Sequence, residues 1–377
     1  MQNTRVFLDA GGHAPVHPAA RQAVAAAVDQ GWADPRRLYS EARQARLLLD
    51  AAREVIAGAL GARPGEVRFT PSHTASLHTA VLAVGGARQR AGRRVVASAV
   101  ERAALLAAGQ HLGGDLVTVE VDDEGRVDLD AWFAAIGPDV AVAALQHANG
   151  EVGTLQPVSA AWEATHNAGV PLLVDAGASV GHLAIGSSWD VLAADPGDWG
   201  GPAGIGVVAV RPHVRTTAVG PEDVDPWAPG GVSVPAAVGA AAALQAVLAD
   251  QAELEKRHRR LIDRIREAVA RTVPDVQVAG DPVHRLPHVV TFSCLYVDGE
   301  ALLTELDRRG FAVGSGSACT SATLQPSHVL VAMGTLTHGN VRLALPATVT
   351  EKDVDRFLAE LPDAVATVRQ LFGAVGL

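Results

Sequence analysis

The sequence predicts an α/β protein whose central sheet is mostly parallel. Short β-rich runs alternate with segments that carry apolar residues at helical spacing, and this alternation is typical of a parallel sheet covered by helices. With 377 residues, the chain is too long for one small core and suits two domains. No apolar run approaches the roughly 18 residues of a membrane-spanning helix, so no membrane association is expected.

Six strands are expected in the first part of the chain, because six runs are short, apolar and rich in β-branched residues. They are EVRFT (66–70), RVVASA (94–99), DLVTVEV (115–121), VAVAAL (140–145), PLLVDA (171–176) and GVVAV (206–210). A helix is expected over 40–60, where apolar residues recur at helical spacing. One long helix is expected over 234–272, and it should link the large domain to a smaller one.

The smaller domain should combine the first residues of the chain with its last third. Its elements, in order, should be strand HVVTFS (288–293), helix GEALLTELDRRG (299–310), strand NVRLAL (340–345) and a final helix that begins with the capping-box-like TEKD (350–353). We therefore expect a large domain at 15–255 and a small domain made of 1–14 and 256–377.

The composition narrows the class of protein. A net charge of −10 disfavours broad contact with nucleic acid or an anionic membrane surface. Two cysteines cannot form a disulfide framework in a chain of this size. The opening MQNTRVFLDAGG lacks the basic region and apolar stretch of a secretion signal. A cytoplasmic protein without a nucleic-acid partner is therefore expected.

Lysine is nearly absent, and this limits the chemistry available. Among 31 lysine and arginine residues, only Lys256 and Lys352 are lysines. The glycine-rich stretch ADPGDWGGPAGIG (194–206) lies between two apolar runs, where α/β enzymes place a catalytic side chain. The middle of this stretch carries Asp198 and no lysine. Any mechanism that needs a lysine nucleophile has two candidates in the whole chain.

Two stretches follow predicted strands and could hold a ligand. In TPSHTASLHTAV (70–81), Ser72 and Thr74 open a helix whose N-terminus favours an anion such as phosphate, although plain N-capping is the commoner role. In LLVDAGASVGH (172–182), Asp175 ends a buried strand. A carboxylate at this point can pair with a protonated ring nitrogen or cap the next turn.

The same stretch leaves a hydrolase open as a minor alternative. Residues 177–181 fit the G-x-S-x-G pattern of a nucleophile elbow, with Ser179 as the nucleophile. That motif should lead straight into a helix, and the following HLAIGSSWD is a poor helix.

Further candidates lie towards the C-terminus. Cys319, in the small-residue stretch FAVGSGSACTSATLQPSHVL (311–330), suits a nucleophile that moves between a pocket and an acceptor, whereas Cys294 should pack inside a strand. Arg342, in an apolar strand, needs an anionic partner, either a substrate carboxylate or a structural salt bridge. The 14 histidines are scattered, no group of His and Cys has metal-ligand spacing, and no metal is expected.

Taken together, these stretches resemble the cysteine desulfurases, pyridoxal-phosphate enzymes of the class V aminotransferase fold. VFLDAGGHAPVHPAA resembles the family's YLDxxATTPxxP, HANGEVGTLQPV (147–158) resembles HVNNEIGxxQPI, and LLVDAGASVG resembles xxVDAxQSxG. GSGSACTSATLQPSHVLVAMG is close to SSGSACxSxxxxPSHVLxAxG, and NVRLAL to xxRxSxG. The resemblance implies an aspartate aminotransferase-like fold, with a mainly parallel seven-stranded sheet, a small α+β C-terminal domain and a homodimer.

The resemblance also implies roles for individual residues. Cys319 would be the persulfide nucleophile of the subgroup with a long Cys loop, which feeds iron–sulfur or thio-modification pathways. Arg342 would bind the substrate carboxylate, with Asn149 also on the substrate side. The pyridoxal-phosphate contacts that remain would be Ser72, Thr74 and Asp175.

The chain departs from the family at the cofactor. The family's lysine loop reads SxHKxxGPxGxG, and when it is aligned on GGPAGIG the Schiff-base lysine falls on Asp198, which cannot form an imine. The histidine that stacks on the cofactor ring is Arg102. Two polar anchors are Gly150 and Ala178, and a phosphate-binding threonine is Gly231. Pyridoxal phosphate is therefore not expected to be bound covalently, and it could be absent.

Two functions remain in competition. The first is a pseudoenzyme that docks a sulfur-acceptor protein, pairs with an active desulfurase relative, or carries on Cys319 a persulfide made elsewhere. The second is an active desulfurase or lyase that holds pyridoxal phosphate non-covalently and uses Asp198 or an external amine, or that has altered chemistry in the same cleft.

Overall fold

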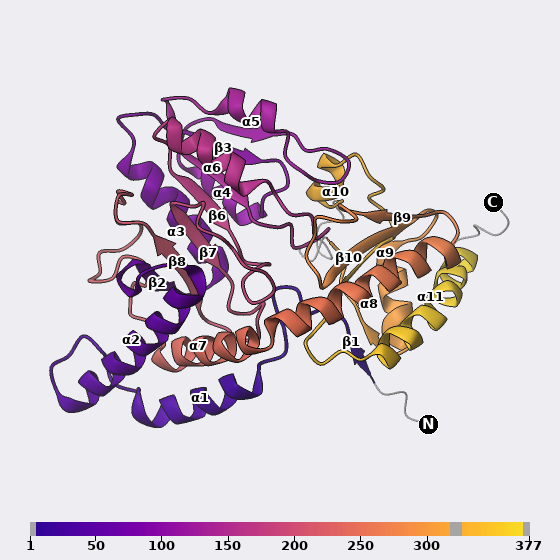
Figure 1. The fold of residues 1–377 in the computed structure, drawn as a ribbon, viewed down its shortest axis with the longest axis horizontal. Helices are drawn as coiled ribbons and strands as arrows, with labels where there is room; N and C mark the ends of the chain where they lie inside the picture. Colours follow the sequence, from indigo (N-terminus) through magenta and orange to yellow (C-terminus); the bar gives the residue numbers. More distant parts are fainter. Residues whose placement is uncertain (1–4, 317–325, 372–377) are drawn as a thin grey trace.

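The computed structural model describes residues 5–316 and 326–371. Figure 1 shows two parts side by side: a large sheet with its helices, and a smaller group of strands and helices from the C-terminal third. Helix α8 (Gln251–Thr272) runs from the first part across to the second.

The large part is built on one seven-stranded sheet with the order β2-β8-β7-β6-β5-β3-β4. Every pairing from β4 through β7 is parallel, whereas β8 runs antiparallel to both of its neighbours. The predicted mainly parallel seven-stranded sheet is confirmed. Its strands are β2 (Val67–Thr70), β3 (Arg94–Ser98), β4 (Leu116–Val119), β5 (Val140–Gln146), β6 (Leu172–Asp175), β7 (Val191–Ala194) and β8 (Gly206–Val210).

Helices cover both faces of this sheet. Val96 and Leu145 face one apolar cluster with α2, α6 and α7, while Val95 and Ala144 face another with α3 and α4. Since neighbouring residues of a strand point to opposite faces, both must be apolar, which explains uninterrupted runs such as VAVAAL. The helices are α1 (Pro18–Gln30), α2 (Ser40–Leu60), α3 (His73–Ala87), α4 (Ala103–His111), α5 (Leu129–Ala135), α6 (Val158–Asn167) and α7 (Val234–Ala249), with a short 3₁₀ turn at Pro64–Glu66.

The expected single helix over 234–272 is wrong. The segment forms α7 and α8, which meet at Asp250 with a bend of 73°. The segment bends because its two halves pack on different cores. Helix α7 is buried against the large sheet, whereas one face of α8 packs on the core of the small part. Among the described residues, no single helix is long and apolar enough to cross a membrane; α7 and α8 reach that length only as this bent pair.

The smaller part has an antiparallel sheet in the order β12-β10-β9. Val6 and Leu8, from the start of the chain, pack into its apolar core beside residues of α8 and α11. The domain limits expected from the sequence stay a prediction. The elements of this part are β1 (Val6–Phe7), β9 (Val276–Ala279), β10 (Val289–Cys294), α9 (Gly299–Arg308), β11 (Phe311–Ala312), α10 (His328–Ala332), β12 (Asn340–Ala344) and α11 (Glu351–Leu371).

Candidate functional site

The carboxyl ends of the parallel strands carry most of the predicted site residues. Strand β6 ends at Asp175, and β7 leads into the glycine-rich loop that holds Asp198. Both carboxylates are buried. Ligands of open α/β sheets bind at this edge, because loops from several strands meet there.

Asp175 is surrounded by partners from its own chain. Its Oδ1 lies 2.9 Å from Nε2 of His73 and accepts a hydrogen bond from the Gly177 amide. Its Oδ2 forms a 3.0 Å ion pair with Nε of Arg102. Burial alone would raise the pKa of Asp175, but His73 and Arg102 hold it well below its usual range. Asp175 is therefore a charged carboxylate with both oxygens engaged.

His73 was not predicted as a site residue, although it stands between the two predicted hydroxyls of the same motif. It is buried at the start of α3, next to the end of β6. A Cβ on Gly177 would lie only 2.5 Å from His73 Nε2, so the close contact needs a glycine there. The glycine two residues after Asp175 is the one feature of the sequence that pointed to a close contact at this place.

Arg102 provides the positive charge of the site. Burial would lower the pKa of its guanidinium, yet the carboxylates of Asp175, Asp195 and Asp198 raise it overall. The pKa of Asp195 is itself raised, first by burial and also by the charge of Asp198. One arginine therefore offsets the charges of the buried Asp175 and Asp198 and of the partly buried Asp195, which would otherwise repel one another.

Asp198 is held by contacts on both oxygens. Its Oδ1 accepts a 2.8 Å hydrogen bond from the Gly12 amide, and its Oδ2 lies 3.1 Å from Nε2 of His182. The two lysines lie elsewhere: Lys256 is exposed on α8 and Lys352 is exposed on α11. Neither lysine supplies an amine at the ends of the parallel strands.

The two predicted hydroxyls have ordinary positions at a helix start. Ser72 is the N-cap of α3, and its side chain accepts a 3.1 Å hydrogen bond from the Ala75 amide. Thr74 is exposed in the first turn. The capping role that was left open for Ser72 is the one seen here, and phosphate binding by either hydroxyl stays a prediction.

The hydrolase alternative is wrong. Ser179 is fully buried, and its hydroxyl has no hydrogen-bond partner within the described part of the chain. The residues after it form turns and no helix. A nucleophile elbow needs an exposed serine at a strand-to-helix turn with a base beside it, and none of these conditions is met.

The predicted substrate residues are engaged with other groups of the chain. Asn149 is buried, donates to the carbonyl of Val100 and accepts from the amides of Glu151 and Val152, so its side chain shapes the loop. Arg342 donates to Asp9 Oδ1 over 2.7 Å. The salt bridge that was one of two options for Arg342 is therefore present, and a substrate role for either residue stays a prediction.

Of the two cysteines, only Cys294 lies within the described residues. It is buried in β10, and burial raises the pKa of its thiol to about 12, which makes it unreactive near neutral pH. This agrees with the packing role expected for it. The predicted nucleophile Cys319 lies outside the described residues.

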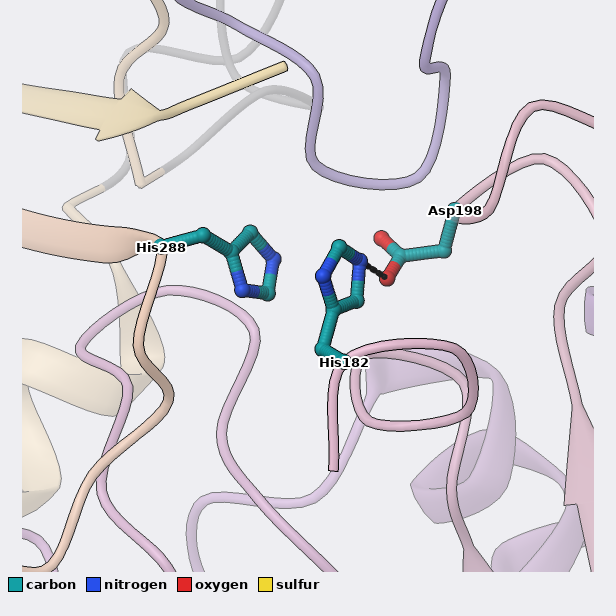
Figure 2. A group of neighbouring side chains, drawn as sticks. All are labelled: His182, Asp198 and His288. Atoms are coloured by element: carbon teal, nitrogen blue, oxygen red, sulfur yellow. Dashed lines mark ion pairs between the residues drawn. The ribbon is translucent and has the colours of Figure 1, made fainter. Parts of the chain in front are cut away.

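A group that the sequence did not reveal surrounds Asp198. Figure 2 shows His182, Asp198 and His288 side by side, with the rings of the two histidines facing each other. The ring centroids are 3.6 Å apart, and the ring planes differ by 15°. Burial is the first cause that holds the pKa of His288 well below its usual range. The three residues come from separate loops, so their spacing along the chain gave no signal of this contact.

Comparison with known proteins places the chain in a family. The model of the family described as aminotransferase class-V matches residues 6–357. A cysteine desulfurase of Cereibacter sphaeroides is 34% identical, and the alignment covers 98% of each chain. An IscS-like cysteine desulfurase of Mycobacterium tuberculosis is 36% identical over 97% of each chain. The chain belongs to the cysteine desulfurase family.

Solved structures agree with this desulfurase homologue in fold. A NifS-like protein superposes with a TM-score of 0.89 at 23% identity, covering 97% of this chain and 100% of that one. A NifS-like protein from Rickettsia africae superposes with a TM-score of 0.83 at 20% identity, covering 96% of this chain and 99% of that one. The predicted fold, that of the pyridoxal-phosphate-dependent transferases, is confirmed. Family membership supports pyridoxal phosphate as the cofactor against which the site has to be tested.

Proposed function

We propose that this cysteine desulfurase homologue is a non-catalytic member of its family that acts as a partner in sulfur transfer. The observation that carries the proposal is Asp198. A buried carboxylate stands where the family's motif has the cofactor lysine, and its oxygens already contact the Gly12 amide and His182. A carboxylate has no amine with which to bind the aldehyde of pyridoxal phosphate.

The ion pair between Arg102 and Asp175 supports the same conclusion. In the family, the matching aspartate pairs with the ring nitrogen of the cofactor. Here both oxygens of Asp175 are engaged by His73, Gly177 and Arg102. A pyridinium ring would have to displace the ion pair between the buried Asp175 and the partly exposed Arg102. The residues present do not fit pyridoxal phosphate held as the family holds it.

A role as a sulfur carrier would need only the thiolate of Cys319. This thiolate would attack the outer sulfur of a persulfide on a donor protein. A bond forms between Cys319 Sγ and that sulfur as the sulfur–sulfur bond of the donor breaks. The proton of the donor persulfide stays on the transferred sulfur, and the donor leaves as a thiolate, so no oxidant or reductant is needed. An active desulfurase relative is the donor we propose.

An apolar surface supports a homodimer. Large apolar side chains are exposed on α1, on α2 and on the segment between them, and a monomer rarely leaves so many together. They are Val28, Trp32, Leu38, Tyr39 and Leu47. We expect Leu38→Asp to shift the protein towards the monomer in sedimentation experiments, whereas Val283→Asp, at an exposed apolar position of the small part, should not.

The first test is whether pyridoxal phosphate attaches to the chain and supports chemistry. Purified protein is incubated with pyridoxal phosphate, reduced with borohydride and weighed by mass spectrometry, and release of sulfide and alanine from cysteine is measured alongside. We expect no reduced adduct and no turnover. The double variant Asp198→Lys with Arg102→His should gain the adduct, because it restores the amine and removes the cation beside Asp175.

The second test is whether Cys319 accepts sulfur. The protein is incubated with an active desulfurase and cysteine, and its mass is compared before and after reduction with a thiol. We expect an added sulfur atom in the wild type and in the matched control Cys294→Ala, and none in Cys319→Ala. Cysteine turnover by the wild type with pyridoxal phosphate, abolished by Cys319→Ala, would overturn the proposal in favour of the active-enzyme alternative.

A further inference from the structure

His182, Asp198 and His288 bring three potential metal ligands to one buried point between the two parts of the molecule. His182 lies in the turn after β6, Asp198 in the loop between β7 and β8, and His288 directly before β10. One ligand atom from each side chain lies within 4.8 Å of the other two, and all three residues are buried. Figure 2 shows the carboxylate and the two imidazoles converging from three segments.

The atoms that meet there lack hydrogen-bond partners in the described chain. His182 Nε2 and Asp198 Oδ2 form a 3.1 Å ion-pair contact, but neither atom has a hydrogen-bond partner in the described chain. His288 Nδ1 is also buried without one. Buried polar atoms in native proteins nearly always have a partner, and leaving one unpaired costs about 1–3 kcal/mol. An ion bound between the three side chains would give these buried residues a partner.

The surroundings orient the carboxylate for this role. The Gly12 amide donates to Asp198 Oδ1, which leaves Oδ2 directed at His182. Such a hydrogen bond to the second oxygen is the usual support of a carboxylate that binds a metal through one oxygen. Arg342, in the small part, is a cation close enough to lower the pKa of His288, and its guanidinium is paired with Asp9.

We propose that His182, Asp198 and His288 bind a divalent transition-metal ion, with zinc as the ion to test first. Two imidazole nitrogens and one carboxylate oxygen are a common donor set for zinc and for other first-row metals. Ligand atoms on one tetrahedral zinc are about 3.3 Å apart when the bonds are about 2.0–2.1 Å. The 3.1 Å spacing of His182 and Asp198 meets this value. The His288 ring is stacked on that of His182, so it has to turn and shift before one of its nitrogens points at the same ion.

Three protein ligands leave one coordination position for water or a substrate atom. The ion would also offset the charge of Asp198, and so reduce its repulsion of the partly buried Asp195. In the proposed site, a metal ion therefore supplies the positive charge that the lysine supplies in the family's motif. This inference is independent of the sulfur-carrier role, because it involves neither Cys319 nor pyridoxal phosphate.

The test uses cobalt as a visible probe and zinc as its competitor. The full chain is treated with a chelator and dialysed, and Co²⁺ is titrated while the visible spectrum is recorded. We expect one Co²⁺ per chain, an absorption band typical of tetrahedral coordination, displacement of that band by Zn²⁺, and a higher Tm with either ion. His288→Asn and Asp198→Asn should weaken binding at least tenfold, because loss of even an outer-sphere partner costs about 10–100-fold.

The matched control is His258→Gln. His258 is a buried histidine next to His288, with ring centroids 6.3 Å apart, but its Nε2 lies 3.2 Å from the Pro346 carbonyl and it is not one of the three ligands. Glutamine keeps a donor for that carbonyl, and cobalt binding should be unchanged. Circular dichroism confirms the fold of each variant. No cobalt band in the wild type, or equal affinity in wild type and His288→Asn, would overturn the proposal.

Discussion

Acidic side chains are paired with cations in different ways at the ends of the parallel strands and on the facing side of the small part. At the strand ends, Asp175 is almost completely buried and is balanced by Arg102 and His73. On the facing side, Arg342 and Asp9 form a single ion pair that is partly exposed to solvent. Asp175 is therefore held by two side-chain partners, of which Arg102 is 36% exposed, whereas Asp9 is held by one.

Under the proposed function, this difference would explain how a contact to the cofactor is replaced while the fold is kept. A buried acid that has lost its ligand needs another cation, because an unpaired buried charge is strongly destabilising. Arg102 supplies such a charge to Asp175. In the pair of Arg342 with Asp9, water screens the partly exposed Asp9.

The largest expected effect is that of Asp175→Asn. Loss of this carboxylate leaves the cation of Arg102 without its closest partner. The free energy of unfolding should fall by about 3 kcal/mol, the lower end for a broken buried pair, because the Arg102 side chain is 36% exposed. The folded-state pKa of Asp175 lies well below its unfolded value near 3.9, so its contribution is present above that value and is lost as pH falls through the folded pKa. Urea unfolding at several pH values measures both effects; equal stability of variant and wild type at pH 7 would show that the pair is not important.

A smaller change in the free energy of unfolding, with the opposite dependence on pH, is expected for Glu101→Gln. Glu101 is fully buried, and burial is the main cause that raises its pKa well above the usual range. The wild type therefore loses stability as pH rises from the unfolded value near 4.3 towards the folded pKa, by about 1.4 kcal/mol per pH unit. The variant has no proton to lose, so it should become more stable than the wild type between pH 5 and 7. Parallel curves of unfolding free energy against pH would contradict this.

Asp9→Asn should have a still smaller effect. The 2.7 Å contact with Arg342 is charge-assisted but partly exposed, so its loss should lower the free energy of unfolding by about 1.5 kcal/mol. Chemical denaturation of the variant beside Asp175→Asn gives the comparison directly. A loss as large as that of Asp175→Asn would mean that the two regions are not energetically different.

The smallest effect is expected at the surface of the small part. Arg260 and Glu351 join α8 to α11 through a 2.7 Å ion pair in which both side chains are more than half exposed. Glu351→Gln should change the free energy of unfolding by about 0.2–1 kcal/mol, and less at high salt. Thermal unfolding at two salt concentrations measures this change and sets the baseline for the three variants above.

Much of the fold could be predicted from local pattern. Strand β8 lies at the residues expected for it, α2 spans its expected range, and the other expected strands differ by one or two residues at their ends. Strand β7 was missed because its apolar run, VLAA, is too short to stand out between polar loops. The bend at Asp250 was missed because α7 and α8 each continue a helical pattern, and only their separate packing surfaces set the change in direction.

The candidate site, too, could be predicted from the sequence only in part. The sequence by itself determined that the chain is an α/β protein, that Asp198 stands in the glycine-rich loop and that no lysine is near it in the chain, because these follow from residue type and spacing. Only the tertiary structure decided that Arg102 pairs with Asp175 and that His182 and His288 meet at Asp198. Those contacts join loops that are far apart in the sequence, and local periodicity carries no information about which loops a folded sheet brings together.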